Sequence, residues 1–462
     1  MGHTTSSLLY LITIICFVLA LRFLSSPRTA RRGNLVGAAG MAVAIAVTLA
    51  QPGVAINWEI IVGAAIGTAF GAVGARRVKM TAMPQMVALF NGVGGGAAAL
   101  VSIAEFHLLV PEPGNLHRDV SLAIVLSALI GSISFSGSMV AFAKLQELLS
   151  GRPITYPGQQ IVNLGLFGAL IAGGVAIVAG YEEQWVLVAM VLGALVFGVL
   201  FVLPIGGADM PVVISLLNAF TGLAAAATGF ELGSNVLIVS GALVGASGTL
   251  LTMMMGKAMN RSIGNVLFGA FGQVQAGAGS TSALTGTVRS VNAEDVAIML
   301  SYAQKVVIVP GYGLAVAQAQ HAVRELADLL EAKGIEVTFA IHPVAGRMPG
   351  HMNVLLAEAN VPYTALKEMD EVNPEFAQTD VVLVIGANDV VNPAARNDPG
   401  SPIYGMPILN VDQAKQIVVS KRSMATGFAG IDNPLFLDPK TAMLFGDAKE
   451  SVLKLIAGVK AL

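Results

Sequence analysis

The stretch with the most specific chemistry is an apolar run at 306–309 that leads into Gly311, Tyr312 and Gly313. An apolar strand, a Gly-x-Gly turn and a helical pattern after it are typical of the first turn of a dinucleotide-binding fold. Glycine permits a tight turn and a close approach to phosphate, and the start of a helix offers unpaired backbone N–H groups. Position 316 is Val, where the usual fingerprint has Gly or Ala, so the motif indicates a nucleotide site only together with its neighbours.

A second candidate for phosphate binding is the pair Lys421 and Arg422, which Ser423 follows. Adjacent basic side chains and a hydroxyl suit a 2′-phosphate through charge-assisted hydrogen bonds, and the alternative is a solvated surface pair. In a fold that binds NAD, a carboxylate near the end of the second strand would bind the ribose hydroxyls. That position lies near His342 and offers no acid, so the pattern favours NADP over NAD.

The elements that must position these residues alternate between strands and helices. Asn292, with Asp295 three residues later, predicts a helix start with Asn as the N-cap. We expect strands at 306–309, 336–341, 381–385, 407–411, 416–420 and 442–445, and helices at 314–333, 351–359 and 447–460. The alternation predicts a parallel sheet with helices on both faces, and a ligand then lies across the carboxyl edge of that sheet.

The composition of the 462-residue chain does not fit a soluble domain alone. It is 55% hydrophobic and 12% charged, with a mean hydropathy of +0.74. Soluble domains carry about twice that charge, and here the charged residues are concentrated in the last third. A net charge of −2 gives no basic footprint for nucleic acid. The lone Cys16 excludes an intrachain disulfide and a cysteine-based metal site, and we expect no metal.

Nine apolar runs long enough to span a membrane precede the alternating region. They lie at 6–23, 34–51, 57–75, 83–104, 120–143, 161–180, 184–204, 210–230 and 235–256. The first lacks the basic start of a signal peptide, so we expect a retained helix. Arg and Lys follow the first, third, fifth and ninth runs, while the loops between carry mainly acids, Glu231 among them. The positive-inside rule therefore places the N-terminus outside and the C-terminal domain in the cytoplasm.

Few polar groups interrupt these runs, and no charged residue or histidine is expected at mid-depth. The six histidines, His3, His107, His117, His321, His342 and His351, lie outside the expected spans. An amide in hydrocarbon is costly unless it meets a partner or water. Asn91 and Asn218 therefore predict either a wet path, to which Ser138 would contribute, or simple hydrogen bonds between helices.

The region that joins the two parts, 272–290, is rich in Gly, Ala, Ser and Thr without periodicity, which predicts a flexible connection. We expect a transmembrane domain at 1–262, a linker at 263–291 and a soluble domain at 292–462. The predicted fold class is a polytopic α-helical membrane domain of about nine spans, followed by a Rossmann-like α/β domain with a parallel sheet that binds NADP(H).

Read in order, the motifs of essentially the whole chain resemble those of the beta subunit of proton-translocating NAD(P) transhydrogenases. The resemblance is carried by 206–213, 257–262, 310–313, 342–353, 386–389 and 421–424. It implies that NADP(H) contacts Gly311, Tyr312, Gly313, Val344, Ala345, Gly346, Arg347, Met348, Pro349, Gly386, Ala387, Asn388, Asp389, Val390, Gly405, Met406, Lys421, Arg422, Ser423, Met424, Ala425, Thr426, Gly427, Phe428, Asp447 and Ala448. Lys421, Arg422 and Ser423 would hold the 2′-phosphate.

The resemblance also implies residues that link the nucleotide to protons. Asp389 is the acid beside the bound nucleotide, the loop at 427–434 covers the cofactor, and Arg261 lies where the membrane part meets the soluble domain. Some members carry a histidine where this chain has Asn91, and an amide takes up no proton. Either the partner chain supplies the titrating group, which we favour, or water held by Asn91, Ser138 and Asn218 carries the proton.

The implied activity is transfer of hydride from NADH to NADP⁺, coupled to proton movement into the cytoplasm across a bacterial inner membrane. One dinucleotide site cannot serve two cofactors, so an alpha subunit must bring the NAD(H) domain and further membrane helices, and we expect a dimer of the heteromeric unit in lipid. The alternative reading is a channel or transporter gated by a nucleotide-sensing domain. The sequence offers no catalytic acid, nucleophile or metal constellation, which fits direct hydride transfer.

Overall fold

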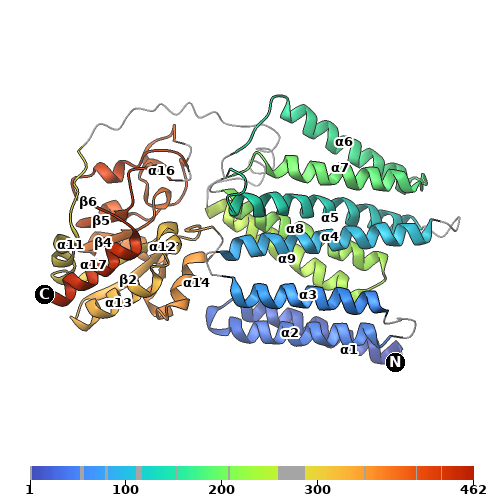
Figure 1. Ribbon diagram of the computed structural model, residues 1–462, viewed down its shortest axis with the longest axis horizontal. Helices are drawn as coiled ribbons and strands as arrows, with labels where there is room; N and C mark the ends of the chain where they lie inside the picture. Colours follow the sequence, from blue (N-terminus) through green and yellow to red (C-terminus); the bar gives the residue numbers. More distant parts are fainter. Residues whose placement is uncertain are drawn as a thin grey trace. The chain divides into compact units, whose positions relative to one another are not determined.

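The computed structural model describes residues 3–51, 57–78, 82–110, 117–150, 153–206, 209–258, 287–347, 350–401, 403–427 and 429–462. Within these ranges the chain forms two compact units, one that contains most of the N-terminal helices and one that contains the C-terminal sheet (Figure 1). Each unit is described by itself.

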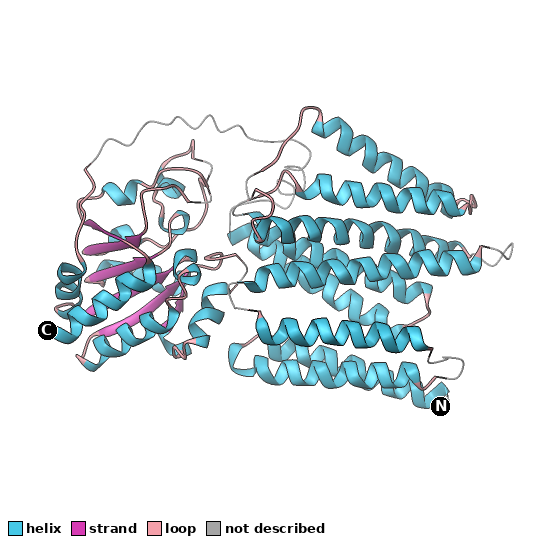
Figure 2. Ribbon diagram, viewed as in Figure 1, coloured by secondary structure: helices cyan, strands magenta, loops and turns pink. Residues whose placement is uncertain are grey.

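The described part of the N-terminal unit consists of helices joined by loops and turns (Figure 2), and nine of these helices are long and apolar enough to cross a membrane. They are α1 (His3–Leu24), α2 (Pro27–Leu49), α3 (Trp58–Arg77), α4 (Met83–Leu109), α5 (Arg118–Leu145), α6 (Gln159–Val178), α7 (Gln184–Val202), α8 (Met210–Glu231) and α9 (Asn235–Ala258). Each overlaps one predicted run, so the prediction of a membrane protein with nine spans is confirmed for this part of the chain.

Helix α5 lies at the centre of this unit and is buried along most of its length, whereas α3 has no buried residue. Glycines bring α4 and α5 into direct contact. A Cβ added at Gly131 would lie 2.6 Å from the Gly95 carbonyl oxygen, and one added at Gly95 would lie 2.9 Å from that of Gly131. No side chain fits there, so backbone meets backbone, as is common between membrane helices.

The C-terminal unit is built on a sheet of six parallel strands in the order β3-β2-β1-β4-β5-β6. The strands are β1 (Lys305–Pro310), β2 (Glu336–Ile341), β3 (Leu366–Glu368), β4 (Val381–Ile385), β5 (Gln416–Lys421) and β6 (Thr441–Phe445). The order reverses between β1 and β4, which is the position where open parallel sheets bind their ligands at the carboxyl ends of the strands. The predicted Rossmann-like class is confirmed.

The two faces of the sheet are covered differently. One carries α11 (Ala293–Ser301), α13 (Gln320–Ala332) and α17 (Ala448–Ala461), which pack against one another (Figure 1). The other carries short helical turns, among them α15 (Met369–Val372), η4 (Asn373–Gln378), η6 (Val411–Gln413) and η7 (Pro434–Leu437). Val307 and Val309 of β1 face this second layer, whose side chains include Phe376 and Phe436.

Several predicted elements need correction. The helix expected at 314–333 is two helices, α12 (Tyr312–Val316) and α13, because Gln318 takes a positive φ of 51° between them. The strand expected at 407–411 is wrong: this segment runs into η6 and pairs with no strand among the described residues. The short β3 was missed, since Leu366-Lys367-Glu368 has no apolar run. The N-cap at Asn292 is confirmed, because its side chain accepts a hydrogen bond from the Asp295 N–H at 2.8 Å.

The chain joins the sheet before α11 begins. The Met443 N–H donates to the Arg289 carbonyl at 2.7 Å, the Val291 N–H donates to the Met443 carbonyl at 3.0 Å, and Ser290 bridges to Met443 in parallel. Arg289 to Val291, which the sequence assigned to the linker, therefore lie along the edge strand β6. The rest of the expected linker falls mostly at 259–286, outside the described residues.

Candidate nucleotide-binding site and membrane polar layers

A cavity of about 450 Å³ opens at the carboxyl ends of β1, β4 and β5. Loops that are far apart in the sequence meet around it because parallel strands all end at this edge. Its predicted lining residues are Gly311, Tyr312, Gly313, Val344, Ala345, Gly346, Gly386, Ala387, Asn388, Asp389, Val390, Met406, Lys421, Arg422, Ser423, Ala425, Thr426, Gly427, Asp447 and Ala448. Four further lining residues were not predicted: Val316, Ala317, Ser420 and Gly446. Each is next in sequence to a predicted residue or one turn beyond it, which is the signal that could have found them.

The remaining predicted residues lie elsewhere or are not described. Arg347, Gly405 and Met424 do not line the cavity. Met348, Pro349, Phe428 and Arg261 lie outside the described residues. Gly405 has a structural reason for its identity, since its φ is +78° and its N–H donates to the Ala395 carbonyl at 2.7 Å.

The Gly-x-Gly turn packs two strand ends together. The Gly311 N–H donates to the Ile385 carbonyl and the Gly313 N–H to the Gly386 carbonyl, both at 2.9 Å. A Cβ at either glycine would collide with the backbone at 386–387. These two N–H groups are therefore occupied, and the glycines serve the close contact of the β1 and β4 turns, where the sequence motif suggested a cradle for phosphate.

Buried donors face the cavity without a partner. The Ser420 side chain is 2% exposed, and its Oγ forms no hydrogen bond with any described residue. The Asn388 Nδ2 is likewise buried and makes no such bond. A buried donor left unsatisfied costs on the order of 1–3 kcal/mol, so such groups mark places where a ligand completes the bonding. Both donors suit phosphate or ribose oxygens, and the residues present fit a phosphorylated dinucleotide.

The two basic residues at the end of β5, Lys421 and Arg422, have different surroundings. The Lys421 ammonium donates to the Ala425 carbonyl and lies 4.7 Å from the centre of the Phe436 ring. Burial lowers the pKa of Lys421, and the charges of Asp389 and Asp432 act against that shift. The Arg422 side chain is exposed at the cavity rim. Lys421 thus holds the following loop, and Arg422 keeps its guanidinium available to an anion.

Asp389 anchors the loop that follows Arg422. Its Oδ2 accepts a hydrogen bond from the Ala429 N–H at 3.0 Å, and a Cβ at Gly427 would come within 2.5 Å of Oδ1. The Asn433 side chain donates to the Asn388 carbonyl and Oδ1, both at 3.1 Å. The loop is therefore hydrogen-bonded to the Asp389 carboxylate. We expect a ligand that displaces Asp389 to displace the loop as well.

Two histidines fix the loop after β2. The His342 Nδ1 accepts from the Val344 N–H at 3.2 Å, so its Nε2–H donates to the Pro407 carbonyl at 2.8 Å. The His351 Nδ1 accepts from the Arg347 N–H at 3.1 Å. Burial lowers the pKa of both histidines to about 4, and the Arg347 charge adds to the effect on His351. Both are therefore neutral structural groups at pH 7.

Arg347 and Tyr312 form one wall of the site. The Arg347 guanidinium carbon lies 4.4 Å from the centre of the Tyr312 ring, a cation–π geometry. Tyr312 lines the cavity, whereas Arg347 does not. The resemblance placed both against the nucleotide, and the two side chains contact each other.

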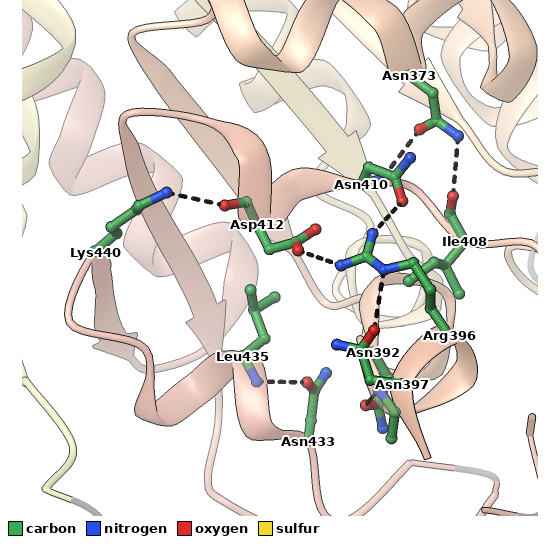
Figure 3. A network of polar contacts seen from close by, with 11 residues as sticks. Asn373, Asn392, Arg396, Asn397, Ile408, Asn410, Asp412, Asn433, Leu435 and Lys440 are labelled. Atoms are coloured by element: carbon green, nitrogen blue, oxygen red, sulfur yellow. Dashed lines mark hydrogen bonds and ion pairs between the residues drawn. The ribbon is translucent and has the colours of Figure 1, made fainter. Parts of the chain in front are cut away.

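A polar network holds the segment that supplies Met406 to the cavity (Figure 3). Arg396 donates to the Asn410 side chain at 2.8 Å and to the Asp412 carboxylate at 2.5 Å. Asn373 receives the Asn410 N–H at 3.0 Å and donates to the Ile408 carbonyl at 3.1 Å. The segment at 407–411, predicted as a strand, forms none. Side-chain hydrogen bonds hold it in place of the backbone hydrogen bonds of a sheet.

In the helical unit, a first polar layer forms around Asn91. Its side chain is 8% exposed and donates to the Ser138 Oγ at 2.9 Å and to the Ser134 Oγ at 3.4 Å. Ser134 in turn shares a hydrogen bond with Thr221 of α8 at 2.6 Å. Asn91 thus forms a hydrogen bond between helices, one of its two predicted roles, whereas the half-buried Asn218 side chain makes no hydrogen bond with a described residue.

A second polar layer lies further along the same three helices. Ser127 of α5 and Thr228 of α8 share a hydrogen bond of 2.7 Å. Ser102 of α4 donates to the Glu231 carboxylate at 2.7 Å. Glu231, counted above as a loop acid, is the last residue of α8 and only 7% exposed. His107, placed outside the spans above, lies in the last turn of α4 and contacts Gln184 at 3.0 Å.

The comparisons with known proteins agree with this combination of a helical bundle and a dinucleotide site. The family model of the NAD(P) transhydrogenase beta subunit matches residues 6–458. The NAD(P) transhydrogenase subunit beta of Rhodospirillum rubrum is 49% identical over 464 residues, which cover 99% of this chain and 99% of the relative. A second sequence from that species matches to the same extent. This chain is therefore a member of the NAD(P) transhydrogenase beta subunit family.

Proposed function

We propose that this chain binds NADP(H) in the 450 Å³ cavity and takes part in the reaction NADH + NADP⁺ → NAD⁺ + NADPH, driven by proton movement into the cytoplasm. It would be both an oxidoreductase and a translocase. Hydride passes from NADH on a partner alpha subunit to NADP⁺ on this chain. The two nicotinamide rings must approach to about 3–3.5 Å, so the partner's NAD(H) domain has to dock at the cavity mouth.

The observation that carries the proposal is the chemistry of the cavity rim. Two buried donors, Ser420 Oγ and Asn388 Nδ2, have no partner among the described residues. The exposed Arg422, two residues after Ser420, lines the same cavity. At the end of β2, where an NAD site would place a carboxylate, the chain has the neutral, buried His342. A cationic rim and no acid at the ribose position support NADP(H) over NAD(H).

The chain's own residues bind and orient the nucleotide. Tyr312 offers an aromatic face to the cavity, and Arg422 with Ser423 suits the 2′-phosphate. The loop at 427–434 would cover the cofactor, and its contact with Asp389 gives it a carboxylate on which to rest. We propose that this loop and Asp389 form the two-state element whose balance differs between NADP⁺ and NADPH.

The helical unit would supply the proton path and the driving force. The hydroxyl and amide layers around Asn91 and Ser127 are the polar groups that line it. A proton crossing about 180 mV releases on the order of 4 kcal/mol, which shifts a product ratio roughly a thousandfold. Coupling requires that proton binding change the affinities for NADP⁺ and NADPH unequally. Arg261, where the two parts join in sequence, completes the residues we assign to coupling.

The assembly follows from this division of work. We propose a multi-pass protein of the bacterial inner membrane, with its N-terminus outside, a transmembrane domain at 1–262, a linker at 263–291 and a cytoplasmic NADP(H) domain at 292–462. The name subunit beta in the relatives supports an alpha partner, which would carry the NAD(H) domain and further membrane helices. We expect two copies of that heteromeric unit.

The test is hydride transfer from NADH to an NADP⁺ analogue in vesicles that contain this chain and its alpha partner, with and without an imposed proton gradient. We expect the gradient, acid outside, to accelerate transfer severalfold or more. Transfer that is indifferent to the gradient would keep the redox role and reject the proton path. Ion flux without any transfer would reject the transhydrogenase reaction and favour a nucleotide-gated channel.

A further inference from the structure

The buried carboxylate of Glu231 has an environment unlike that of the other acids in the described chain. It ends α8 inside the bundle, and its side chain is 7% exposed. Its Oε1 accepts the Ser102 hydroxyl at 2.7 Å, while its Oε2 is buried and makes no hydrogen bond with a described residue. It forms no ion pair with any described Lys or Arg. A buried carboxylate without a countercharge is costly to keep ionised, so taking up a proton relieves it.

The second polar layer connects this carboxylate to the rest of the bundle. Ser102 and Ser127 are fully buried, and the Oγ of each lies near the Ala98 carbonyl oxygen, at 3.1 Å and 3.5 Å. Ser127 also shares its bond with Thr228, one turn before Glu231 on α8. Hydroxyl groups both donate and accept, so Ser102 can exchange a proton with Glu231 and Ser127 with Thr228, while the Ala98 carbonyl can only accept.

Each of the three helices reaches both layers on one face. On α4, Asn91 and Ser102 are eleven residues apart, about 16 Å along the helix. On α5, Ser138 and Ser127 have the same spacing in the opposite direction. Between the layers lie Gly95 and Gly131, whose backbones touch. The chain therefore holds two hydroxyl-rich layers, separated by a short stretch that a proton crosses only when water enters or the helices move.

The charged residues near Glu231 do not provide another proton-binding group within the two polar layers. On α4, Glu105 lies near enough for its charge to act on Glu231. On α5 the nearest charges, Arg118 and Asp119, lie in the first turn, about two turns before Ser127. On α9 the only charge is Lys257 in the last turn. Asn91 in the first layer does not ionise. Glu231 is thus the one buried acid that touches either layer among the described residues.

We propose that Glu231 is the proton-binding residue of this chain, located in the outer of the two polar layers, which rests on the proposed function. A proton from the outside adds to the Oε2 lone pair and converts the carboxylate to the neutral acid, which now donates where it could only accept. Release of this proton through the Ser102 hydroxyl, which contacts Oε1, returns the carboxylate. The chain therefore needs no titrating residue at position 91, and the partner is not required to supply the only one.

The experiment replaces Glu231 with Gln in the complete enzyme with its alpha partner in vesicles. We expect E231Q to lose gradient-driven turnover by at least about tenfold, because the amide keeps the Ser102 contact and binds no proton. Single-turnover hydride transfer to NADP⁺ that is already bound should stay at the wild-type rate. Glu183→Gln is the matched control, since Glu183 is an exposed acid before α7, and it should leave both rates unchanged.

The outcomes separate this proposal from the function on which it rests. Gradient-driven turnover in E231Q equal to wild type overturns the role of Glu231 and leaves the transhydrogenase function standing. Wild-type enzyme that ignores the gradient overturns both. If E231Q does not assemble, Glu231→Asp replaces it: the shorter acid should keep coupled turnover but shift its pH profile, and an unshifted profile with full turnover would overturn the proposal.

Discussion

The helical bundle and the sheet domain both join segments through bare backbone, but their buried polar side chains are arranged differently. Gly95 meets Gly131 in the bundle, and Gly311 meets the Gly386 turn in the sheet. In the bundle, neutral side chains bond in pairs, Asn91 to Ser134 and Ser127 to Thr228. In the sheet domain, Ser420 and Asn388 present donors that no described residue satisfies. A path for protons needs connected neutral groups, whereas a site for a phosphorylated ligand needs donors left open.

The largest effect should come from filling the glycine contacts. Gly131→Ala and Gly311→Ala each push a methyl group into backbone atoms, so we expect each to destabilise its own unit by about 3 kcal/mol or more. Thermal unfolding of the detergent-purified complex measures this. Gly67→Ala is the control, because a Cβ there meets nothing within 4 Å. Equal stability of all three variants would show that close backbone contact does not hold the units together.

The next effect tests the open donors and the cationic rim. Arg422→Ala should weaken NADP⁺ binding by roughly 10- to 150-fold, the worth of one charged hydrogen bond, and leave weak NAD⁺ binding unchanged. Calorimetric titration of the complete enzyme provides both constants. Lys333→Ala removes the same charge at an exposed position after α13 and should change neither. A parallel loss of NAD⁺ and NADP⁺ affinity would mean that Arg422 does not read the 2′-phosphate.

The smallest effect is a pH dependence that belongs to the sheet domain. His342 has a folded pKa of about 4 against an unfolded value of 6.5, so the unfolded chain gains a proton first as the pH falls. Stability due to neutral His342 is therefore full above pH 6.5 and declines towards pH 4, by about 1 kcal/mol per pH unit. Urea midpoints between pH 7 and 5.5 should fall less steeply in His342→Gln. The exposed His321→Gln should keep the wild-type slope.

The sequence predicted the broad fold because its signals are local. Nine apolar runs and the alternation after Asn292 follow from hydrophobic periodicity and turn chemistry, and both are seen. The break at Gln318 was not predictable, since a positive φ there depends on the packing of α12 beneath the β4 turn. The segment at 407–411 alternates like a strand, but the Arg396 network holds it instead.

The candidate residues of the sheet domain were predicted better than those of the helical bundle. The family resemblance named most of the cavity residues, and many of them sit in motifs at strand ends. Ser420 was not predicted as a site residue, because the sequence pattern makes it the last residue of a strand. Its hydroxyl is nevertheless a donor without a partner at the cavity. In the bundle, Glu231 looked like a loop acid, because only the packing of α4 against α8 shows that it is buried beside Ser102.

We propose that proton binding in the bundle and nucleotide binding in the sheet domain change each other's affinity. The most direct measurement is the ratio of dissociation constants for NADP⁺ and NADPH in the complete enzyme in vesicles, with and without a proton gradient, for wild type and Asp389→Asn. We predict that the gradient changes the ratio of the two dissociation constants by tenfold or more, up to roughly a thousandfold. We also predict that the change disappears in Asp389→Asn. A ratio that stays constant in the wild-type enzyme would contradict the coupling, and a ratio that shifts equally in both would remove Asp389 from it.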